Sequence, residues 1–156
     1  MAVEIVHGLN SFFTFRIEGE LFAVNVGNIV KILAYSEATK IPNSPSYFKG
    51  VLNLFGDVLP IFDGRLKFGF QEKQRTRETC IVVFAFELEG QILNAGIVVD
   101  SVEKIVNTTA DQVLATEGNK LTPDYIFGTF TLNDETIGVL DLEKIFGEEE
   151  IRLTKL

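Results

Sequence analysis

The sequence of 156 residues contains no tryptophan, one cysteine and one histidine. A single cysteine, Cys80, excludes an intramolecular disulfide, and with His7 as the only histidine the chain lacks the ligands of an ordinary zinc site. Cys80 lies within an apolar segment, so we expect a buried thiol in a reducing compartment. His7 has no catalytic partner near it in the sequence, and we expect it to be an exposed terminal residue.

Long apolar runs and an excess of positive charge are also missing. The densest apolar stretch, residues 81–86, has the length of a strand and is far shorter than the ~18–20 residues that span a bilayer. The first residues do not show the pattern of a secretory signal, so we expect a cytoplasmic protein without membrane insertion. The net charge of −8 disfavours nucleic acid as a partner. Five cations nevertheless gather within residues 65–77, which we interpret as a solvated loop: Arg65, Lys67, Lys73, Arg75 and Arg77.

Known catalytic motifs are absent as well. The sequence contains no nucleophile elbow, phosphate-binding loop, dinucleotide-binding glycine motif or calcium loop. Asp63 and Asp141 occupy matching positions in a repeat described below, and a carboxylate pair can perform acid–base chemistry. However, each follows an apolar strand and precedes a short apolar turn, as a helix N-cap does. We therefore expect two caps, no metal or cofactor, and no enzymatic activity.

What the sequence does contain is a repeat. Residues 47–69 match residues 125–147 at an offset of 78 without a gap, with tyrosine, glycine, leucine, aspartate and phenylalanine in register. A looser match relates residues 18–32 to residues 89–105. A fixed internal period indicates a repeated architecture, and two copies are too few for a solenoid. The repeat therefore predicts a pseudo-symmetric pair of small subdomains.

The local patterns within each copy are those of short strands and turns. Alternation of apolar and polar residues predicts a strand over 13–18, followed by a hairpin partner over 21–26. Further hairpins are expected over 51–62, over 80–99, which is apolar on both faces and therefore central, and over the second copy of the repeat. The helical spacing of Ile29, Ile32 and Leu33 predicts a short helix or bend, and residues 141–147 a short helix that ends near Gly147. The fold expected is mainly β: two small packed barrels.

One position breaks the repeat. Phe55 aligns with Asn133, a polar residue typical of turns, so that one hairpin tip carries an aromatic ring where the other carries an amide. Two interpretations remain open. The ring of Phe55 either folds back over the end of a barrel or belongs to a contact surface, since exposed aromatic residues act as interface anchors.

The residues around Phe55 resemble a known family. Gly50-Val-Leu-Asn-Leu-Phe-Gly-Asp-Val-Leu-Pro-Ile-Phe-Asp63 resembles the signature of CheW-like domains, roughly G-V-x-N-L-R-G-x-x-x-P-x-x-D-L. Residues 22–32, residues 41–45 and the segment Gly96-Ile-Val-Val-Asp-Ser-Val102 agree with other elements of that family. No single piece decides the matter, but together they cover about residues 12–147.

The resemblance implies two pseudo-symmetric five-stranded SH3-like β-barrel subdomains with short helices, packed intimately in a single domain over 12–147, with terminal extensions at 1–11 and 148–156. It also implies a non-catalytic adaptor, or scaffold, that couples the cytoplasmic tips of methyl-accepting chemoreceptors to a CheA-type histidine kinase in chemotaxis. Two other hypotheses are an adaptor of this fold in another CheA-linked pathway, such as surface motility, and a double barrel that binds a small ligand.

By resemblance, the receptor-facing surface includes Ile29, Lys31, Gly50, Phe55 and Gly56, whereas no residue is assigned to the kinase contact. The chain departs from the family pattern at two of these positions. Phe55 replaces the usual arginine of N-L-R-G, and Lys31 replaces a usual glutamate. Any ion pair between the usual residues cannot form here, and we expect either a divergent receptor partner or a different role in the assembly.

Overall fold

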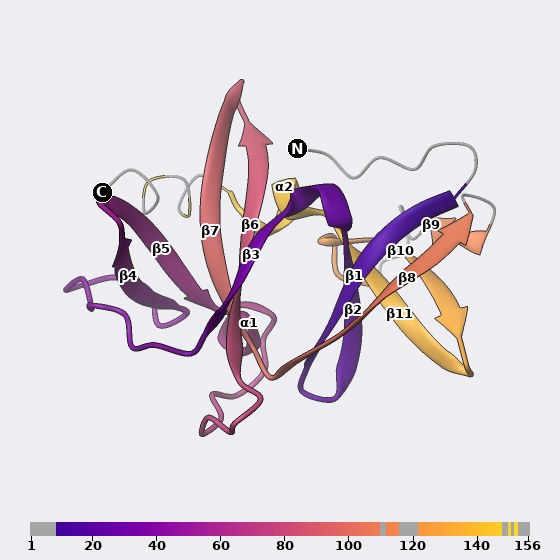
Figure 1. Ribbon diagram of the computed structural model, residues 1–156, viewed down its shortest axis with the longest axis horizontal. Helices are drawn as coiled ribbons and strands as arrows, with labels where there is room; N and C mark the ends of the chain where they lie inside the picture. Colours follow the sequence, from indigo (N-terminus) through magenta and orange to yellow (C-terminus); the bar gives the residue numbers. More distant parts are fainter. Residues whose placement is uncertain (1–8, 110–111, 116–121, 148–149, 151, 153–156) are drawn as a thin grey trace.

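The computed structural model describes residues 9–109, 112–115, 122–147, 150 and 152. His7 and the rest of residues 1–8 lie outside these ranges. The chain forms two β-rich lobes that lie side by side in Figure 1. Its strands are β1 (Leu9–Ile17), β2 (Glu20–Asn25), β3 (Ile29–Ala34), β4 (Phe48–Leu54), β5 (Asp57–Asp63), β6 (Cys80–Leu88), β7 (Gln91–Val99), β8 (Ser101–Thr109), β9 (Leu114–Ala115), β10 (Ile126–Leu132) and β11 (Glu135–Leu140). Its helices are the 3₁₀ turn η1 (Val26–Asn28), α1 (Gly64–Lys67) and α2 (Leu142–Ile145).

The two lobes are sheets with equivalent strand orders, except that the second has a sixth strand, β9, where five were expected. The first runs β3-β6-β7-β5-β4, at the left in Figure 1, and the second β8-β1-β2-β11-β10-β9, at the right. Each has an antiparallel hairpin near its centre, β6–β7 in the first sheet and β1–β2 in the second. The second strand of each hairpin pairs in parallel with a further strand, β7 with β5 and β2 with β11. The predicted mainly β fold with two related subdomains is confirmed.

The subdomains are not the two halves of the sequence, which a simple repeat would give. The hairpin β1–β2 belongs to the first copy of the repeat but completes the sheet built from β8 to β11 of the second copy. Conversely, the hairpin β6–β7 of the second copy completes the sheet of β3 to β5. The repeat correctly predicts two related subdomains, but each barrel combines strands from both copies of the repeat.

Each sheet closes into a barrel through the segment that follows its edge strand. Beyond β3, Thr39 exchanges two backbone hydrogen bonds with Val51 of β4, at 2.8 and 3.0 Å. Beyond β8, β9 pairs with β10 at Gly128. A glycine lies at both closures because the two backbones approach closely: a Cβ on Gly50 would lie 2.0 Å from the Thr39 carbonyl oxygen, and one on Gly128 would lie 2.9 Å from the Leu114 oxygen. We call the five-stranded unit the first barrel and the other unit the second barrel.

A shared apolar core joins the barrels. It contains residues of β1 and β2 from the second barrel, of β5, β6 and β7 from the first, and of α2. The aromatic residue after each helix reaches into the other barrel: Phe68 stacks on Tyr125 with centroids 4.6 Å apart, and Phe146 stacks on Phe86 at 4.3 Å. Such pairs add about 0.5–1.5 kcal/mol each beyond area burial, so the barrels form one packed body.

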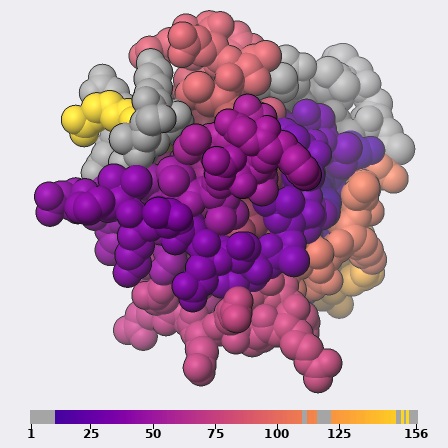
Figure 2. Space-filling model, turned by 60° about the vertical axis from the view of Figure 1, so that its left-hand side comes forward, coloured from indigo at the N-terminus to yellow at the C-terminus, as the bar shows by residue number. Residues whose placement is uncertain are grey.

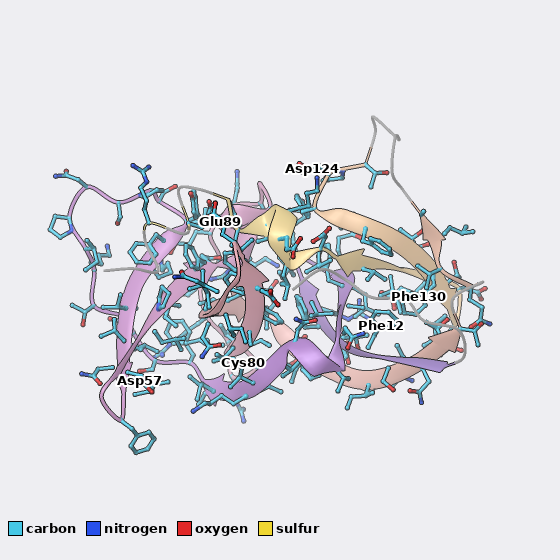
Figure 3. The ribbon with its side chains drawn as sticks, turned by 90° about the horizontal axis from the view of Figure 1, so that it is seen from above. Phe12, Asp57, Cys80, Glu89, Asp124 and Phe130 are labelled. Atoms are coloured by element: carbon cyan, nitrogen blue, oxygen red, sulfur yellow. The ribbon has the colours of Figure 1, made fainter. Side chains whose placement is uncertain are left out.

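Each barrel also has an interior of its own. Phe12 of β1 and Phe130 of β10 pack in the second barrel with centroids 5.8 Å apart, and they lie together in Figure 3. Leu59, Ile61 and Ile81 fill the first barrel. Because alternate residues of a strand face opposite sides, β1 directs Phe12 into its barrel while Phe13 faces the shared core. None of the helices in the described ranges is long and apolar enough to cross a membrane.

The helix or bend expected at Ile29, Ile32 and Leu33 is wrong, because these residues belong to strand β3. The pairing of β3 with β6 contains a bulge between Ile29 and Lys31. One extra residue on the bulged strand reverses the faces that follow it. Ile29 therefore packs against the shared core while Leu33 packs against the interior of the first barrel, which produces an apolar spacing like that of a helix.

The predicted caps are confirmed, but the solvated loop is partly wrong. The Asp63 side chain accepts hydrogen bonds from the backbone amides of Arg65 and Leu66, and that of Asp141 accepts one from Glu143. Arg65 is one of the five cations expected in the loop, yet its side chain is only 4% exposed and pairs with the fully buried Asp63 carboxylate. The cap holds a carboxylate at the start of α1, and that carboxylate draws in the guanidinium. Lys73, Arg75 and Arg77 are exposed, as expected.

The edges of the predicted domain carry structure on both sides. Strand β1 begins at Leu9, and Glu150, beyond the predicted end at 147, is buried. Its carboxylate accepts hydrogen bonds from Lys67, from the Tyr47 hydroxyl at 3.2 Å and from the Gly147 amide at 3.1 Å. Burial acts to raise the pKa of Glu150, but the hydrogen bonds from Lys67 and the backbone outweigh it and hold the pKa below its usual value.

This contact predicts a pH-dependent contribution to stability. Because the folded-state pKa of Glu150 is lowered, its stabilisation is fully present above the unfolded-state value of about 4.3 and disappears as the pH falls through the folded-state value. We expect Glu150→Gln to reduce the free energy of unfolding at pH 7 by about 1–2 kcal/mol, with the difference from wild type shrinking below about pH 4. Urea titrations at several pH values measure this difference in the free energy of unfolding. The exposed Glu78→Gln serves as control, and a pH-independent gap would contradict the assignment.

Candidate docking surfaces

The tip of the β4–β5 hairpin places Phe55 in full contact with solvent. The Phe55 side chain is 100% exposed, so the interpretation in which the ring folds over the barrel end is wrong. Phe55 and Gly56 have φ values of 53° and 91°, and the Asn53 side chain accepts a hydrogen bond from the Gly56 amide at 3.1 Å. Two consecutive positive φ values are typical of a type I′ turn, which favours Asn and Gly.

The equivalent turn in the second barrel shows how unusual Phe55 is. Asn133 and Asp134 have φ values of 52° and 62°, so both hairpins turn in the same way. Asparagine tolerates this backbone conformation, whereas a bulky residue in it carries strain of about 1–2 kcal/mol. A strained and fully exposed aromatic residue contributes nothing to the folded chain alone, which directs attention to a contact with another molecule.

Phe55 stands over a groove of mixed polar and apolar lining at the mouth of the first barrel. This mouth groove has a volume of about 390 Å³ and is lined by Val30 and Lys31 of β3, Phe55, Val58 and Leu59 around the hairpin, and Ile92 of β7, among others. Ile92 is 73% exposed, and Val30 and Val58 are about half exposed. Asp57, which also lines the groove, marks the hairpin tip in Figure 3. Large apolar side chains from three elements therefore meet at one solvent-exposed place.

The mouth of the second barrel has no large exposed apolar side chain among its described lining residues. Its hollow, of about 220 Å³, includes Asn133 at the position of Phe55 and Glu135 at that of Asp57. Arg16 donates to Glu103 at 2.6 Å and to both oxygens of Glu135 at 2.6 and 2.9 Å. These hydrogen bonds raise the pKa of Arg16 and lower that of Glu135. An internal ion-pair network thus occupies this mouth.

The looser sequence match relates the two mouths. It aligns Lys31 with Lys104 and Val30 with Glu103, and in both β3 and β8 a bulge lies next to these residues. The mouth groove has valine where the other barrel has the acidic partner of Arg16. Lys31 and Asp57, the charged residues that line the mouth groove, are not joined by an ion pair in the described part of the chain.

Three of the five residues assigned by resemblance lie together, and two do not. Lys31 and Phe55 line the mouth groove, with Gly56 exposed beside Phe55 in the turn. Ile29 is half-buried and packs against the shared core, and Gly50 is buried at the barrel closure. A partner can touch the first three directly, whereas Ile29 and Gly50 support the strands that carry them.

A second groove, which the sequence did not indicate, lies where the two barrels meet. This junction groove has a volume of about 770 Å³ and is lined by Ile32 and Tyr35 after the bulge in β3, by Arg75 and Arg77 of the loop between α1 and β6, and by Val102 of β8, among others. Ile32 is 45% exposed and Val102 36%. The two strands that line it, β3 and β8, lie far apart in the sequence. The looser repeat that relates them is the only signal in the sequence that connects the two.

The described residues show no arrangement suited to catalysis. They contain no group of three His, Cys, Asp or Glu residues able to hold a metal ion, and every buried polar side-chain atom among them has a hydrogen-bond partner. Asp63 and Asp141 are each engaged in capping their own helix. Cys80 is buried, as expected, and burial raises the pKa of its thiol.

Comparison with known proteins decides the family. The sequence model of the CheW-like domain matches residues 11–150. The chain belongs to the CheW-like domain family. The chemotaxis protein CheW of Klebsiella aerogenes is 32% identical over 144 residues, which cover 91% of this chain and 84% of the relative. The chemotaxis protein CheW of Helicobacter pylori is 32% identical over 143 residues, with coverages of 88% and 82%.

A solved CheW structure has the same fold. The crystal structure of the scaffolding protein TtCheW from Thermoanaerobacter tengcongensis matches with a TM-score of 0.80 at 21% identity, covering 92% of this chain and 96% of that one. At this identity the likeness establishes the fold. Within the CheW-like frame, the two departures noted in the sequence, Lys31 and Phe55, come together in the mouth groove.

Proposed function

We propose that this chain is a non-catalytic adaptor that couples chemoreceptor tips to a CheA-type histidine kinase in the cytoplasm. The observation that carries the proposal is the fully exposed, strained Phe55 beside the exposed apolar side chains of the mouth groove, in a chain of the CheW-like family. Relatives that carry the name chemotaxis protein CheW support it. Two grooves on one body, each with exposed apolar side chains, suit a protein that holds two partners.

The adaptor acts by position. A partner that covers Phe55 removes an aromatic side chain from water, which is worth about 1.5–3 kcal/mol. Lys31 and Asp57 place one charge of each sign in the same groove, so a partner segment that combines apolar side chains with complementary charges fits it best. Simultaneous contact with a receptor and a kinase then shifts the conformational population of the kinase without any chemical step.

Among the residues assigned by resemblance, we propose Lys31, Phe55 and Gly56 as direct contacts of the receptor. Ile29 and Gly50 are proposed to shape this surface from beneath, because the first packs on the core and the second is buried. The junction groove, with Ile32 and Val102, is proposed as a further docking surface of the same adaptor.

Phe55→Asn tests the proposal most sharply, because binding and stability should move in opposite directions. The change copies Asn133 of the other turn. We expect receptor binding to weaken by at least tenfold, as for an interface anchor. We also expect the melting temperature to rise by about 1–4 °C, because relief of backbone strain stabilises the turn by about 0.5–1 kcal/mol. Titration calorimetry with a receptor-tip fragment and scanning calorimetry measure the two effects.

Leu114→Asn is the matched control, since Leu114 is 68% exposed but lines neither groove. It should leave receptor binding unchanged. Equal binding by the Phe55→Asn variant would remove Phe55 from the contact, and a large loss of stability would show that the ring packs against the fold. A pull-down against the CheA-type kinase of the same organism tests the adaptor role itself: absence of binding by the folded chain at micromolar concentration contradicts it.

A further inference from the structure

The two sequence repeats are joined as if they were two separate chains. Repeat one runs from β1 to α1 and repeat two from β6 to α2. Apart from the pairing within each hairpin, β1–β2 pairs with β8 and β11, and β6–β7 with β3 and β5. Among the described strands, every neighbour of the β1–β2 and β6–β7 hairpins therefore comes from the other repeat. Two protomers that exchange an identical element are related in the same way.

Side-chain contacts cross between the repeats in the same reciprocal way. Phe68 of repeat one stacks on Tyr125 of repeat two, and Phe146 of repeat two packs on Phe62 of repeat one with centroids 5.4 Å apart. Polar contacts add to these: Arg65 donates to Asp100 at 3.4 Å, and Arg16 pairs with Glu135. All of these contacts form equally well if the two repeats belong to different copies of the chain.

A single exposed loop connects the repeats. Residues 68–79 lead from α1 to β6 and protrude at the lower edge of the molecule in Figures 1 and 2. Residues 71–78 are all exposed, and the ion pairs of Glu72 with Lys49 and Lys73 with Glu18 hold the first half of the loop. Residues 71–78 can therefore take another path at little cost, whereas separation of the repeats also requires the strand pairs between them to break, as they do on unfolding.

We propose that repeat one of one copy pairs with repeat two of a second copy, giving a reciprocally exchanged dimer of this chain. The partner is thus a second copy of this chain. The surfaces that it binds are the strand edges that pair with the hairpins, β8 and β11 for β1–β2 and β3 and β5 for β6–β7. The closed monomer prevails in dilute solution because the loop gives the second repeat an effective concentration in the millimolar range. The exchanged dimer contains two complete two-barrel units and so carries every docking surface twice.

Complementation between full-length variants tests the exchange. Phe12→Asp damages repeat one, and Ile81→Asp damages repeat two; both side chains are 0% exposed. When the two chains are unfolded, mixed and refolded, an exchanged dimer reunites the intact repeats, and random pairing restores about a quarter of the two-barrel units. We expect a protease-resistant species of dimer size from the mixture and none from either variant alone.

A second mixture of variants is the matched control. Leu59 lies in the same apolar cluster of the first barrel as Ile81 but belongs to repeat one. Phe12→Asp mixed with Leu59→Asp therefore offers no intact repeat one, and we expect no recovery. Recovery in the first mixture alone supports the exchange; recovery in both mixtures or in neither overturns it. If a single variant folds by itself, the wild-type chain refolded at high concentration decides: a slowly dissociating dimer supports the exchange, and monomer alone overturns it.

Discussion

Gly50→Ala is expected to destabilise the fold by about 3 kcal/mol or more, because two penalties coincide at this residue. The added Cβ would lie 2.0 Å from the Thr39 carbonyl oxygen and 2.5 Å from its carbon, and Gly50 has a φ of +127°, which residues with a Cβ rarely adopt. The clash involves backbone on both sides, so no side-chain rotation relieves it. The closure of the first barrel at Thr39 and Val51 should open. Urea unfolding followed by circular dichroism measures the change.

Two other glycines carry one penalty each, either the close approach of the backbone or the positive φ, and so serve as controls. Gly128→Ala brings a Cβ to 2.9 Å from the Leu114 oxygen without a positive φ, and Gly56→Ala leaves open space but keeps a φ of +91°. Each should cost about 1–2 kcal/mol. A Gly50→Ala variant no less stable than Gly56→Ala would show that the close approach at Thr39 does not limit the fold. Loss of receptor binding in a Gly50 variant would reflect the opened barrel and would not identify a contact.

Asp63→Ala is expected to cost about 3–5 kcal/mol, since it leaves a buried charge without its partner. Arg65 donates through Nε and Nη2 to the two Asp63 oxygens at 3.1 Å each, and the side chains are 4% and 0% exposed. Burial acts to lower the pKa of Arg65, but the bonds to Asp63 outweigh it and raise the pKa. After truncation of Asp63, the guanidinium keeps only the 3.4 Å contact with Asp100 among the ion pairs of the described residues.

Asp141→Ala provides the matched comparison in the other repeat. Asp141 caps α2 through one amide and has Glu143 where Asp63 has Arg65. Loss of this cap alone should cost about 1 kcal/mol. The double variant Asp63→Leu with Arg65→Met should recover most of the stability lost in Asp63→Ala, because it removes both charges. Equal effects of Asp63→Ala and Asp141→Ala in denaturant titrations would contradict the buried pair.

Features governed by local sequence were predictable. The hairpins follow from alternation and turn residues, and the caps at Asp63 and Asp141 from a carboxylate between a strand and a turn. Comparison with Asn133 singled out Phe55 but left open whether its ring is exposed. In each case the deciding residues are neighbours in the chain or equivalent residues of the repeat. Nearly all of the strand pattern, and one wall of the mouth groove, could be obtained in this way.

Features that depend on which segments pair were not predictable. Alternation shows which face of a strand is buried but not which strand lies beside it, so the crossing of the hairpins between repeats stayed hidden. The bulge in β3 reversed its faces and imitated a helix. Arg65 resembled a loop cation because its partner Asp63 was assigned only to a cap, and the junction groove joins strands that are 70 residues apart, from Ile32 to Val102.

The connectors between the barrels have a mechanical consequence. The chain passes from the second barrel to the first through η1, three residues long, and returns through Asp100 alone, between β7 and β8. Phe68 and Phe146 each stack on a ring of the other barrel, and with such short connectors these contacts restrict rotation of one barrel against the other. We therefore expect a force applied to one barrel to displace both barrels together as one body.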